Sequence, residues 1–405
     1  MKVTITFSIG LREKMYSDKN SAGNKEISYM VACLGQRLFP DRPSPPVPAD
    51  LDWGRLFNLL KWHHLAAYFY TLRPILGASW PEEFFQGLGD IRKIYILYNG
   101  QFTGHIAQVL SRLRNAGVNV IVLKGWAYIQ TIYGGDYSIR FCQDIDILVH
   151  PQDSAKTAAL LSDLAYQPLD ESWPGYARRF MNAQQYCLFN QPNVLNLDFA
   201  IGFHWGLFHT PFYDPNQVDM DALFSRTRSL SVAGVEVLEL SSEDQIVYAC
   251  AHLGLHHKYD NALNNYYEIG VLIRLTGADL DWQAVIQRAQ AWQCVIPLQR
   301  SLAFLESLWP GLIPPVVLEE ISSIRPVFLE RFVNWWFEKT RGGQAYDHLL
   351  TWITTPGLKR RFAIAFQDIF PSLKYMQKRY GPAPAGHWPL LYFRRFSRAF
   401  LQMRR

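Results

Sequence analysis

Two aspartates one residue apart, Asp144 and Asp146, are the side chains of this sequence best suited to chemistry. The run over residues 141–149 alternates between polar and apolar residues and then becomes fully apolar, which is typical of a buried strand. Side chains two positions apart on a strand point to the same face, so we expect both carboxylates to project together. Two like charges at that range raise a pKa unless a cation lies between them. The pair therefore indicates a Mg²⁺ site, although surface acids at a solvated strand end give the same pattern.

Two basic residues precede this strand. Lys124 comes before a short helical run, and Arg140 comes after it. Residues 118–123 form an apolar, β-branched stretch that predicts a strand, and Lys124-Gly125 then opens a helix. A helix N-terminus attracts phosphate, glycine lets the backbone approach it, and lysine adds a positive charge. Arg140 stands directly before the aspartate strand and could hold a phosphate with two hydrogen bonds. A salt bridge from Arg140 to Asp136 or Asp144 is the alternative.

A third acid, Asp198, lies in another apolar stretch that predicts a strand. A carboxylate there could hold a second metal ion or act as a general base toward an acceptor hydroxyl. Alternation along the strand would put His204 on the same face as Asp198. A structural ion pair for Asp198, and a buried core position for His204, are the alternatives.

Histidines recur near the middle of the chain. Ser241-Ser242-Glu243-Asp244 predicts the start of a helix over residues 245–257, which carries His252 and His256 four positions apart. That spacing can bind a metal on one face, but the sequence lacks the glutamate of the zinc-protease motif. We favour a helical wall that places His256 or Lys258 near a phosphate group.

The predicted strands and helices that carry these residues form a compact α/β unit. Its predicted order is strand, helix, strand, helix and then a hairpin whose strands, 185–190 and 194–200, flank a turn at residues 191–193. Helical patterns precede and follow it. The predicted organisation is a loose extension (1–27), a helical region (28–115), the α/β core (116–210), a second helical region (211–350) and a basic, aromatic C-terminal segment (351–405).

Composition narrows the class of protein. The 405 residues are 49% hydrophobic and 19% charged, which favours a globular protein with a large core over a disordered one. Five scattered cysteines without a C-x-x-C pair argue against a disulfide framework and for a reducing compartment. Because no apolar run reaches the length of a membrane span and no signal peptide is evident, we expect a cytoplasmic protein.

Positive charge is concentrated at the C-terminus. From Lys359 onward, eleven basic residues face one acid, Asp368, and aromatic residues are interleaved with them. Such a segment could contact an anionic partner, such as nucleic acid, anionic lipid or a phosphate-bearing substrate. The alternative is a set of helices that pack their aromatic residues on the core and leave the arginines in solvent.

These residues resemble the uncharacterised nucleotidyltransferase family of bacteria, a branch of the DNA polymerase β-like nucleotidyltransferase superfamily. The similarity rests on VIVLKGWAYIQTIYGG (120–135) and SIRFCQDIDILVHPQDSAKTAALL (138–161), and extends over most of the chain. Further matching elements are Trp62-His63-His64, Phe203-His204-Trp205, the stretch 252–258 and a closing pattern over residues 370–392.

The resemblance implies an α+β fold, with a polymerase β-like nucleotidyltransferase core (a small mixed sheet with helices) flanked by helical regions. It also implies metal-dependent transfer of a nucleoside monophosphate from a nucleoside triphosphate such as ATP. Asp144 and Asp146 match the metal-binding aspartates, with Mg²⁺ or Mn²⁺ as cofactor and Asp198 as the candidate third catalytic ligand. Lys124-Gly125 matches the phosphate element, and Arg140 and His256 are expected to bind nucleotide.

Two departures separate this chain from the pattern of the family. Trp126 follows Gly125 where the superfamily has a small hydroxyl residue, and Gly202 stands where relatives often place an acid, two residues before the His-Trp element. These departures favour an alternative, a catalytically inactive nucleotide-binding or interaction module of a biosynthetic or defence operon. A nucleic-acid-binding protein that acts through its basic C-terminal segment is a third hypothesis. The acceptor hydroxyl, on a small molecule, a protein or an RNA end, stays open.

Overall fold

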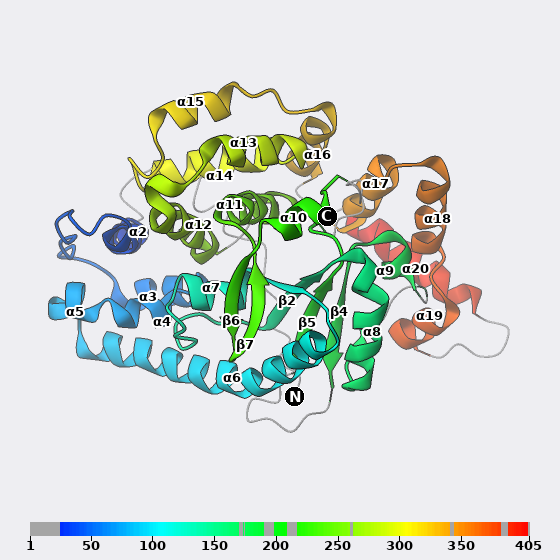
Figure 1. Ribbon diagram of the computed structural model, residues 1–405, viewed down its shortest axis with the longest axis horizontal. Helices are drawn as coiled ribbons and strands as arrows, with labels where there is room; N and C mark the ends of the chain where they lie inside the picture. The colour runs from blue at the N-terminus through cyan, green and yellow to red at the C-terminus, as the bar shows by residue number, and fades with distance from the viewer. Residues whose placement is uncertain are drawn as a thin grey trace.

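The computed structural model describes residues 25–169, 173, 175–189, 198–208, 217–259, 262–340, 344–381 and 388–403. The predicted extension over residues 1–27 therefore lies outside the described residues, except for its last three, which open a helix. In the described part, helices surround a mixed sheet of seven strands (Figure 1). The expected α+β fold with a mixed sheet is confirmed.

The strands follow the order β3-β4-β5-β2-β1-β7-β6 across the sheet. Their bounds are β1 (Val120–Leu123), β2 (Asp144–Val149), β3 (Gln167–Pro168), β4 (Ala183–Leu188), β5 (Phe199–His204), β6 (Arg228–Val232) and β7 (Val235–Glu239). β1 is antiparallel to β2, with Leu123 opposite Asp146. β2 is parallel to β5, with Asp144 opposite Ala200 and Asp146 opposite Gly202. The end of β1 and the starts of β2 and β5 therefore meet at one end of the sheet.

Alternation along β2 separates two hydrophobic cores. Ile145 and Ile147 belong to the core shared with α6 (Glu82–Asn115), whereas Leu148 belongs to the core shared with α11 (Ser242–Ala251) and α12 (Leu263–Thr276). Asp144 and Asp146 alternate with the isoleucines, so they lie on the face of the sheet that α11 and α12 cover. The two carboxylates thus face the helices that follow the sheet in the chain.

The N-terminal helices divide between the two cores: those before residue 82 pack in the core shared with α11 and α12, and the second half of α6 covers the opposite face. They are α2 (Lys25–Leu38), α3 (Trp53–Trp62), α4 (Ala66–Thr71), α5 (Arg73–Leu76), η1 (Gly77–Ser79) and α6. The long helix α6 runs beneath the sheet in Figure 1 and buries Phe102, Ile106, Val109, Leu110 and Leu113, a set at helical spacing. It ends at Asn115, before Gly117 with its positive φ of 72°, as the sequence predicts.

The remaining helices follow the sheet strands or lie beyond them. Between the strands come α7 (Lys124–Thr131), η2 (Pro151–Asp153), α8 (Ser154–Asp163), α9 (Tyr176–Phe180) and α10 (Met220–Ser225). After α11 come the π-helical turn η3 (His252–His256), α12, η4 (Gly277–Asp279), α13 (Trp282–Ala291), α14 (Val295–Leu308), α15 (Pro315–Ser323) and α16 (Phe328–Thr340). The side chain of Ser241 accepts a hydrogen bond from the Asp244 N–H, which confirms the predicted start of α11.

The predicted helical region over residues 211–350 also contains two strands, because β6 and β7 form a hairpin that joins the sheet beside β1. The two residues of its turn, Ala233 and Gly234, have φ values of 51° and 76°, which is the backbone of a tight hairpin turn. Val235 and Val237 on β7 are buried in the core shared with α6. Glu236, the residue between them, is exposed, so β7 alternates between buried and exposed side chains.

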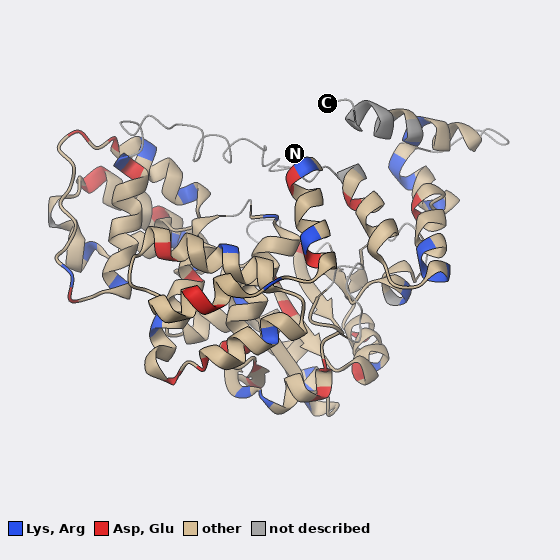
Figure 2. Ribbon diagram, turned by 90° about the horizontal axis from the view of Figure 1, so that it is seen from above, with Lys and Arg blue, Asp and Glu red and all other residues tan. Residues whose placement is uncertain are grey.

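The C-terminal segment folds as α17 (Gln344–Thr354), α18 (Leu358–Ile369), α19 (Leu373–Tyr380) and α20 (Pro389–Met403). Its basic residues stand out on these helices near the C-terminus in Figure 2. Arg360 donates to the Phe180 carbonyl and Arg395 to the Asp368 carbonyl, so part of this charge serves the fold. Phe362 and Phe393 are 74% and 72% exposed, so these aromatic residues do not pack on the core. Contact with an anionic partner stays a prediction.

All five cysteines are free and buried, in agreement with the absence of a disulfide framework. Within the described ranges, no helix combines the length and the apolar character that crossing a membrane requires.

Candidate functional site

Asp146 is the centre of a charged cluster at the end of the sheet. Its Oδ2 lies 2.8 Å from Nζ of Lys124, and its Oδ1 lies 3.3 Å from Nε2 of His204. Lys124 reaches it from the end of β1, and His204 from β5, so three neighbouring strands supply the cluster. Burial alone would raise the pKa of Asp146, but the positive charge of Lys124 and the hydrogen bond to His204 hold it well below its usual value.

The backbone at the turn after β1 is strained. Lys124 has a φ of 32°, and Gly125 has a φ of 21° with a ψ of −92°, which interrupts the first turn of α7. Positive φ is rare for residues other than glycine and costs roughly 1–3 kcal/mol. The kink directs the lysine side chain to Asp146. It also brings Nζ to 2.9 Å from Nε2 of His252, the residue that follows α11. The sequence therefore places Lys124 at the site as predicted, but as a partner of Asp146.

Asp144 lies on the same face and has a different environment. Within the described part of the chain, no ion pair or hydrogen bond reaches its carboxylate. Burial and the charge of the neighbouring Asp146 raise the pKa of Asp144 to about 6. A half-buried carboxylate beside a second one, with solvent access, offers the hard oxygen ligands that Mg²⁺ or Mn²⁺ prefers. The pair therefore fits a divalent cation.

No third acid stands beside the pair on β5. The position opposite Asp146 is Gly202, and a Cβ atom there would lie 1.9 Å from Oδ1 of Asp146. Asp198 is exposed and comes just before β5, because this strand begins at Phe199, later than the sequence predicts. The turn predicted at residues 191–193 lies outside the described residues. The role of Asp198 as a metal ligand stays a prediction.

Arg140 forms a buried ion pair with Glu268. Its Nε lies 2.6 Å from Oε1 of Glu268 and its Nη2 lies 3.2 Å from Oε2, and the Tyr133 hydroxyl donates to the same carboxylate. Neither of the two salt bridges considered for Arg140 forms, since Asp136 pairs with Arg92. Its role in binding nucleotide stays a prediction, but the structure gives the guanidinium a structural partner.

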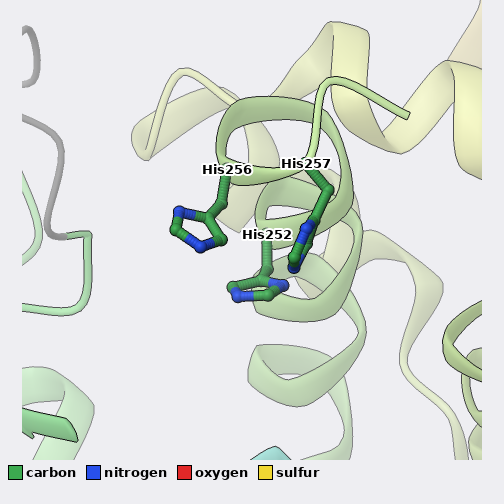
Figure 3. Close-up of side chains that lie close together, drawn as sticks. All are labelled: His252, His256 and His257. Carbon is green, nitrogen blue, oxygen red and sulfur yellow. The ribbon is translucent and has the colours of Figure 1, made fainter. Parts of the chain in front are cut away.

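Three histidines gather at the end of α11 (Figure 3), and Lys124 contacts one of them, His252. His252, His256 and His257 each offer one ring nitrogen, and these nitrogens all lie within 4.8 Å of one another. The sequence pattern identified His252 and His256 but missed His257, because the helix was expected to be regular. The Lys258 ammonium, expected near phosphate, instead lies 2.6 Å from Oδ2 of Asp347 on α17.

Comparisons with known proteins give the family. The sequence pattern of the family described as uncharacterised nucleotidyltransferase matches residues 49–310, which include Lys124, both aspartates of β2 and the three histidines. Among solved structures, the chain is similar to an antigenic nucleotidyltransferase-like protein from Paracoccidioides brasiliensis, at 15% identity and a TM-score of 0.34, over 54% of this chain and 92% of that chain. That likeness is too distant to support an argument about the site, and no curated protein matches the chain. Because the family pattern covers well over half of its residues, the chain belongs to the family of uncharacterised nucleotidyltransferases.

Proposed function

We propose that this protein transfers a nucleoside monophosphate from a nucleoside triphosphate to an acceptor hydroxyl, with Mg²⁺ or Mn²⁺ held by Asp144 and Asp146. One observation carries the proposal: Asp144 has no ion-pair partner among the described residues, although it lies beside the charged Asp146. A carboxylate pair with one unneutralised member is a site that attracts a cation. Family membership favours nucleotide chemistry at that site.

The proposed reaction is an in-line displacement. The acceptor oxygen forms a bond to the α-phosphorus, the bond from that phosphorus to the bridging oxygen breaks, and pyrophosphate leaves with the bonding electrons. A carboxylate takes the hydroxyl proton, and Asp198 is the candidate from the sequence. A bound divalent cation would neutralise charge on the phosphate oxygens. Lys124, at the start of α7, adds a positive charge for phosphate, and Gly125 leaves the backbone accessible.

The other predicted residues differ in how directly they can act. His256 is exposed and belongs to the cluster beside Lys124, so its ring can reach a phosphate at the site. Arg140 is engaged by Glu268 and would act by fixing the turn that precedes β2. In this proposal, Arg140 positions the aspartate strand and His256 contacts the nucleotide.

A second candidate function is a nucleotide-binding module without turnover. Two contacts favour it: the Lys124 ammonium already neutralises Asp146, and Gly202 leaves no space for an acid beside that carboxylate. A chain of this kind would bind a nucleoside triphosphate with its cation and release no pyrophosphate.

The first test follows thermal unfolding of the purified chain with Mg²⁺ and each nucleoside triphosphate. We expect a rise in melting temperature that needs both components and disappears in the Asp144→Asn/Asp146→Asn variant. Asp163→Asn, an exposed acid at the end of α8, is the matched control and should respond like the wild type. Absence of any nucleotide-dependent rise, or an equal rise in the double variant, would refute nucleotide binding at these aspartates.

A pyrophosphate-release assay with pooled acceptors then separates the two candidate functions. Release that depends on an acceptor and is lost in the double variant supports transfer. Metal-dependent binding without release from any acceptor class, whether small molecule, protein or RNA end, supports the inactive module.

A further inference from the structure

Three imidazole rings converge from a single turn of the chain. His252, His256 and His257 have ring centroids 4.6–4.9 Å apart. In a regular α-helix, residues 252 and 256 share a face, but residue 257 points well away from it. The structure instead has a π-helical turn over His252–His256, in which the His257 N–H donates to the His252 carbonyl at 3.2 Å. The wider turn brings the third ring to the other two (Figure 3).

The sequence supports this irregular turn at identifiable positions. A Cβ atom on Gly254 would lie 2.8 Å from the Tyr259 hydroxyl and 3.1 Å from Cβ of Pro297, so a larger residue would collide with its neighbours. Lys258 and Tyr259 have φ values of 52° and 63°, and the Tyr259 N–H closes the turn on the Leu253 carbonyl at 2.9 Å. π-helical turns and strained non-glycine residues concentrate at functional sites, because neither is the most stable local backbone.

The surroundings of the rings suit a metal ion. His252 and His257 are half-buried, which limits the access of bulk water to an ion held between the rings. The His256 side chain is exposed, which gives an ion a route from solvent. A small cavity of about 10 Å³, close to the space of one water molecule, borders His252, His256 and Tyr248.

We propose that His252, His256 and His257 bind a divalent transition-metal ion of the Zn²⁺ class. Imidazole nitrogen suits Zn²⁺, Co²⁺ and Ni²⁺, whereas the carboxylates of β2 suit Mg²⁺. Three protein nitrogens with adjoining room for water correspond to an open site, in which one coordination position is left for a water or a substrate oxygen. This site uses the histidines and not the aspartates of β2, and it shares only His256 with the proposed nucleotide site.

Lys124 connects the two sites. Its Nζ lies 2.9 Å from Nε2 of His252 and 2.8 Å from Oδ2 of Asp146. A metal ion on the histidines would repel this ammonium and compete with it for His252. Removing the charge by Lys124→Met should therefore tighten metal binding at the histidines by roughly tenfold, the effect of about 1.4 kcal/mol.

The test uses the full-length protein after treatment with a chelator and titrates it with Co²⁺, whose visible absorption reports nitrogen ligands. We expect one tightly bound ion, displaced by Zn²⁺, and loss of the absorption band in His256→Gln and in His257→Gln. His105→Gln, a histidine that stacks on Phe199 outside the cluster, should bind like the wild type. So should Asp144→Asn, which removes one carboxylate of the nucleotide site and leaves the pair of Lys124 and Asp146 in place.

Thermal unfolding in chelator checks the fold of each variant. His256→Gln replaces an exposed side chain and should melt like the metal-free wild type, so its loss of the band reports the ligand itself. The proposal is overturned if the wild type binds no Co²⁺, if binding survives both histidine substitutions, or if only Asp144→Asn loses it. Unchanged affinity in Lys124→Met would overturn the connection between the sites.

Discussion

The Nζ atom of Lys124 lies 2.8 Å from Oδ2 of Asp146, so the turn after β1 supplies the positive charge that a carboxylate of β2 needs. The lysine side chain is 26% exposed and the aspartate side chain 11% exposed, so the pair is only partly open to solvent. The strained φ of Lys124 places the ammonium there before any ligand arrives. The Lys124 ammonium can therefore bind a phosphate that enters the site, or it can stay paired with Asp146 and keep a ligand away from that carboxylate.

Replacement of this lysine by methionine should destabilise the protein. Asp146 would keep only His204 as a partner, and we expect a loss of roughly 2 kcal/mol, below the value for fully buried pairs because Lys124 contacts solvent. Urea unfolding in chelator measures the loss, and added Mg²⁺ should recover part of it. Lys93→Met, which removes an ion pair with Asp90 between two exposed side chains, should change stability very little. Equal losses in the two variants would contradict the assigned role of Lys124.

Gly202 should not accept a side chain while Asp146 keeps its present position. A Cβ atom there would lie 1.9 Å from the Asp146 carboxylate, so Gly202→Ala must break the contacts of Asp146 with Lys124 and His204. We expect a loss of about 1–3 kcal/mol in unfolding experiments, as in other overpacked sites. Gly104→Ala on α6 is the opposite case, since no atom lies within 4 Å of its added Cβ, and it should stabilise by about 0.5–1 kcal/mol. A neutral Gly202→Ala would show that Asp146 moves freely.

Patterns within one element were the most predictable part of the molecule. The alternation around Asp144 and Asp146 located β2, and Ser241 located the start of α11, because both depend on neighbouring residues. The hairpin of β6 and β7 was missed because its turn, Ala233-Gly234, carries a weaker signal than asparagine-glycine.

Contacts between distant elements could not be predicted from the sequence. The partner of Arg140 is Glu268, 128 residues away on α12, and local spacing suggested nearer acids. His257 joined the histidine cluster only through the π-helical turn, for which Gly254 and the adjacent histidines are the visible signal. The pattern of side chains along a helix or strand indicates which of its faces is buried. Which residue of a distant element it contacts depends on how the layers of the fold pack together.

The buried pair of Arg140 and Glu268 should show strong coupling. Arg140→Met leaves a buried carboxylate with only the Tyr133 hydroxyl, and we expect a loss of roughly 3–5 kcal/mol. Glu268→Gln should also destabilise, and the double variant should lose much less than the sum of the two. Arg114→Met, from the exposed pair with Glu236, should cost under about 1 kcal/mol. Additive losses from denaturant unfolding would show that the two side chains act independently.

His63 should make stability depend on pH. The ring is buried after α3, and its Nδ1 accepts the N–H of Leu263, a first-turn donor of α12. Burial, then the neighbouring His64, lowers the pKa of His63 from 6.5 to about 4. The unfolded chain therefore binds a proton before the folded chain does, and stability that is complete above pH 6.5 declines as the pH falls toward 4. The decline contributed by this ring is at most about 1.4 kcal/mol per pH unit.

The variant His63→Asn isolates this contribution, because its side-chain oxygen can accept the same hydrogen bond and does not titrate. It should be less stable than the wild type at pH 7, since the smaller side chain leaves a cavity, but its stability should fall less steeply between pH 6.5 and 4. Urea unfolding at a series of pH values gives both slopes. Other buried histidines titrate equally in the two proteins, so the difference between the curves reports His63. Parallel curves would mean that His63 takes up its proton at the same pH in the folded and the unfolded protein.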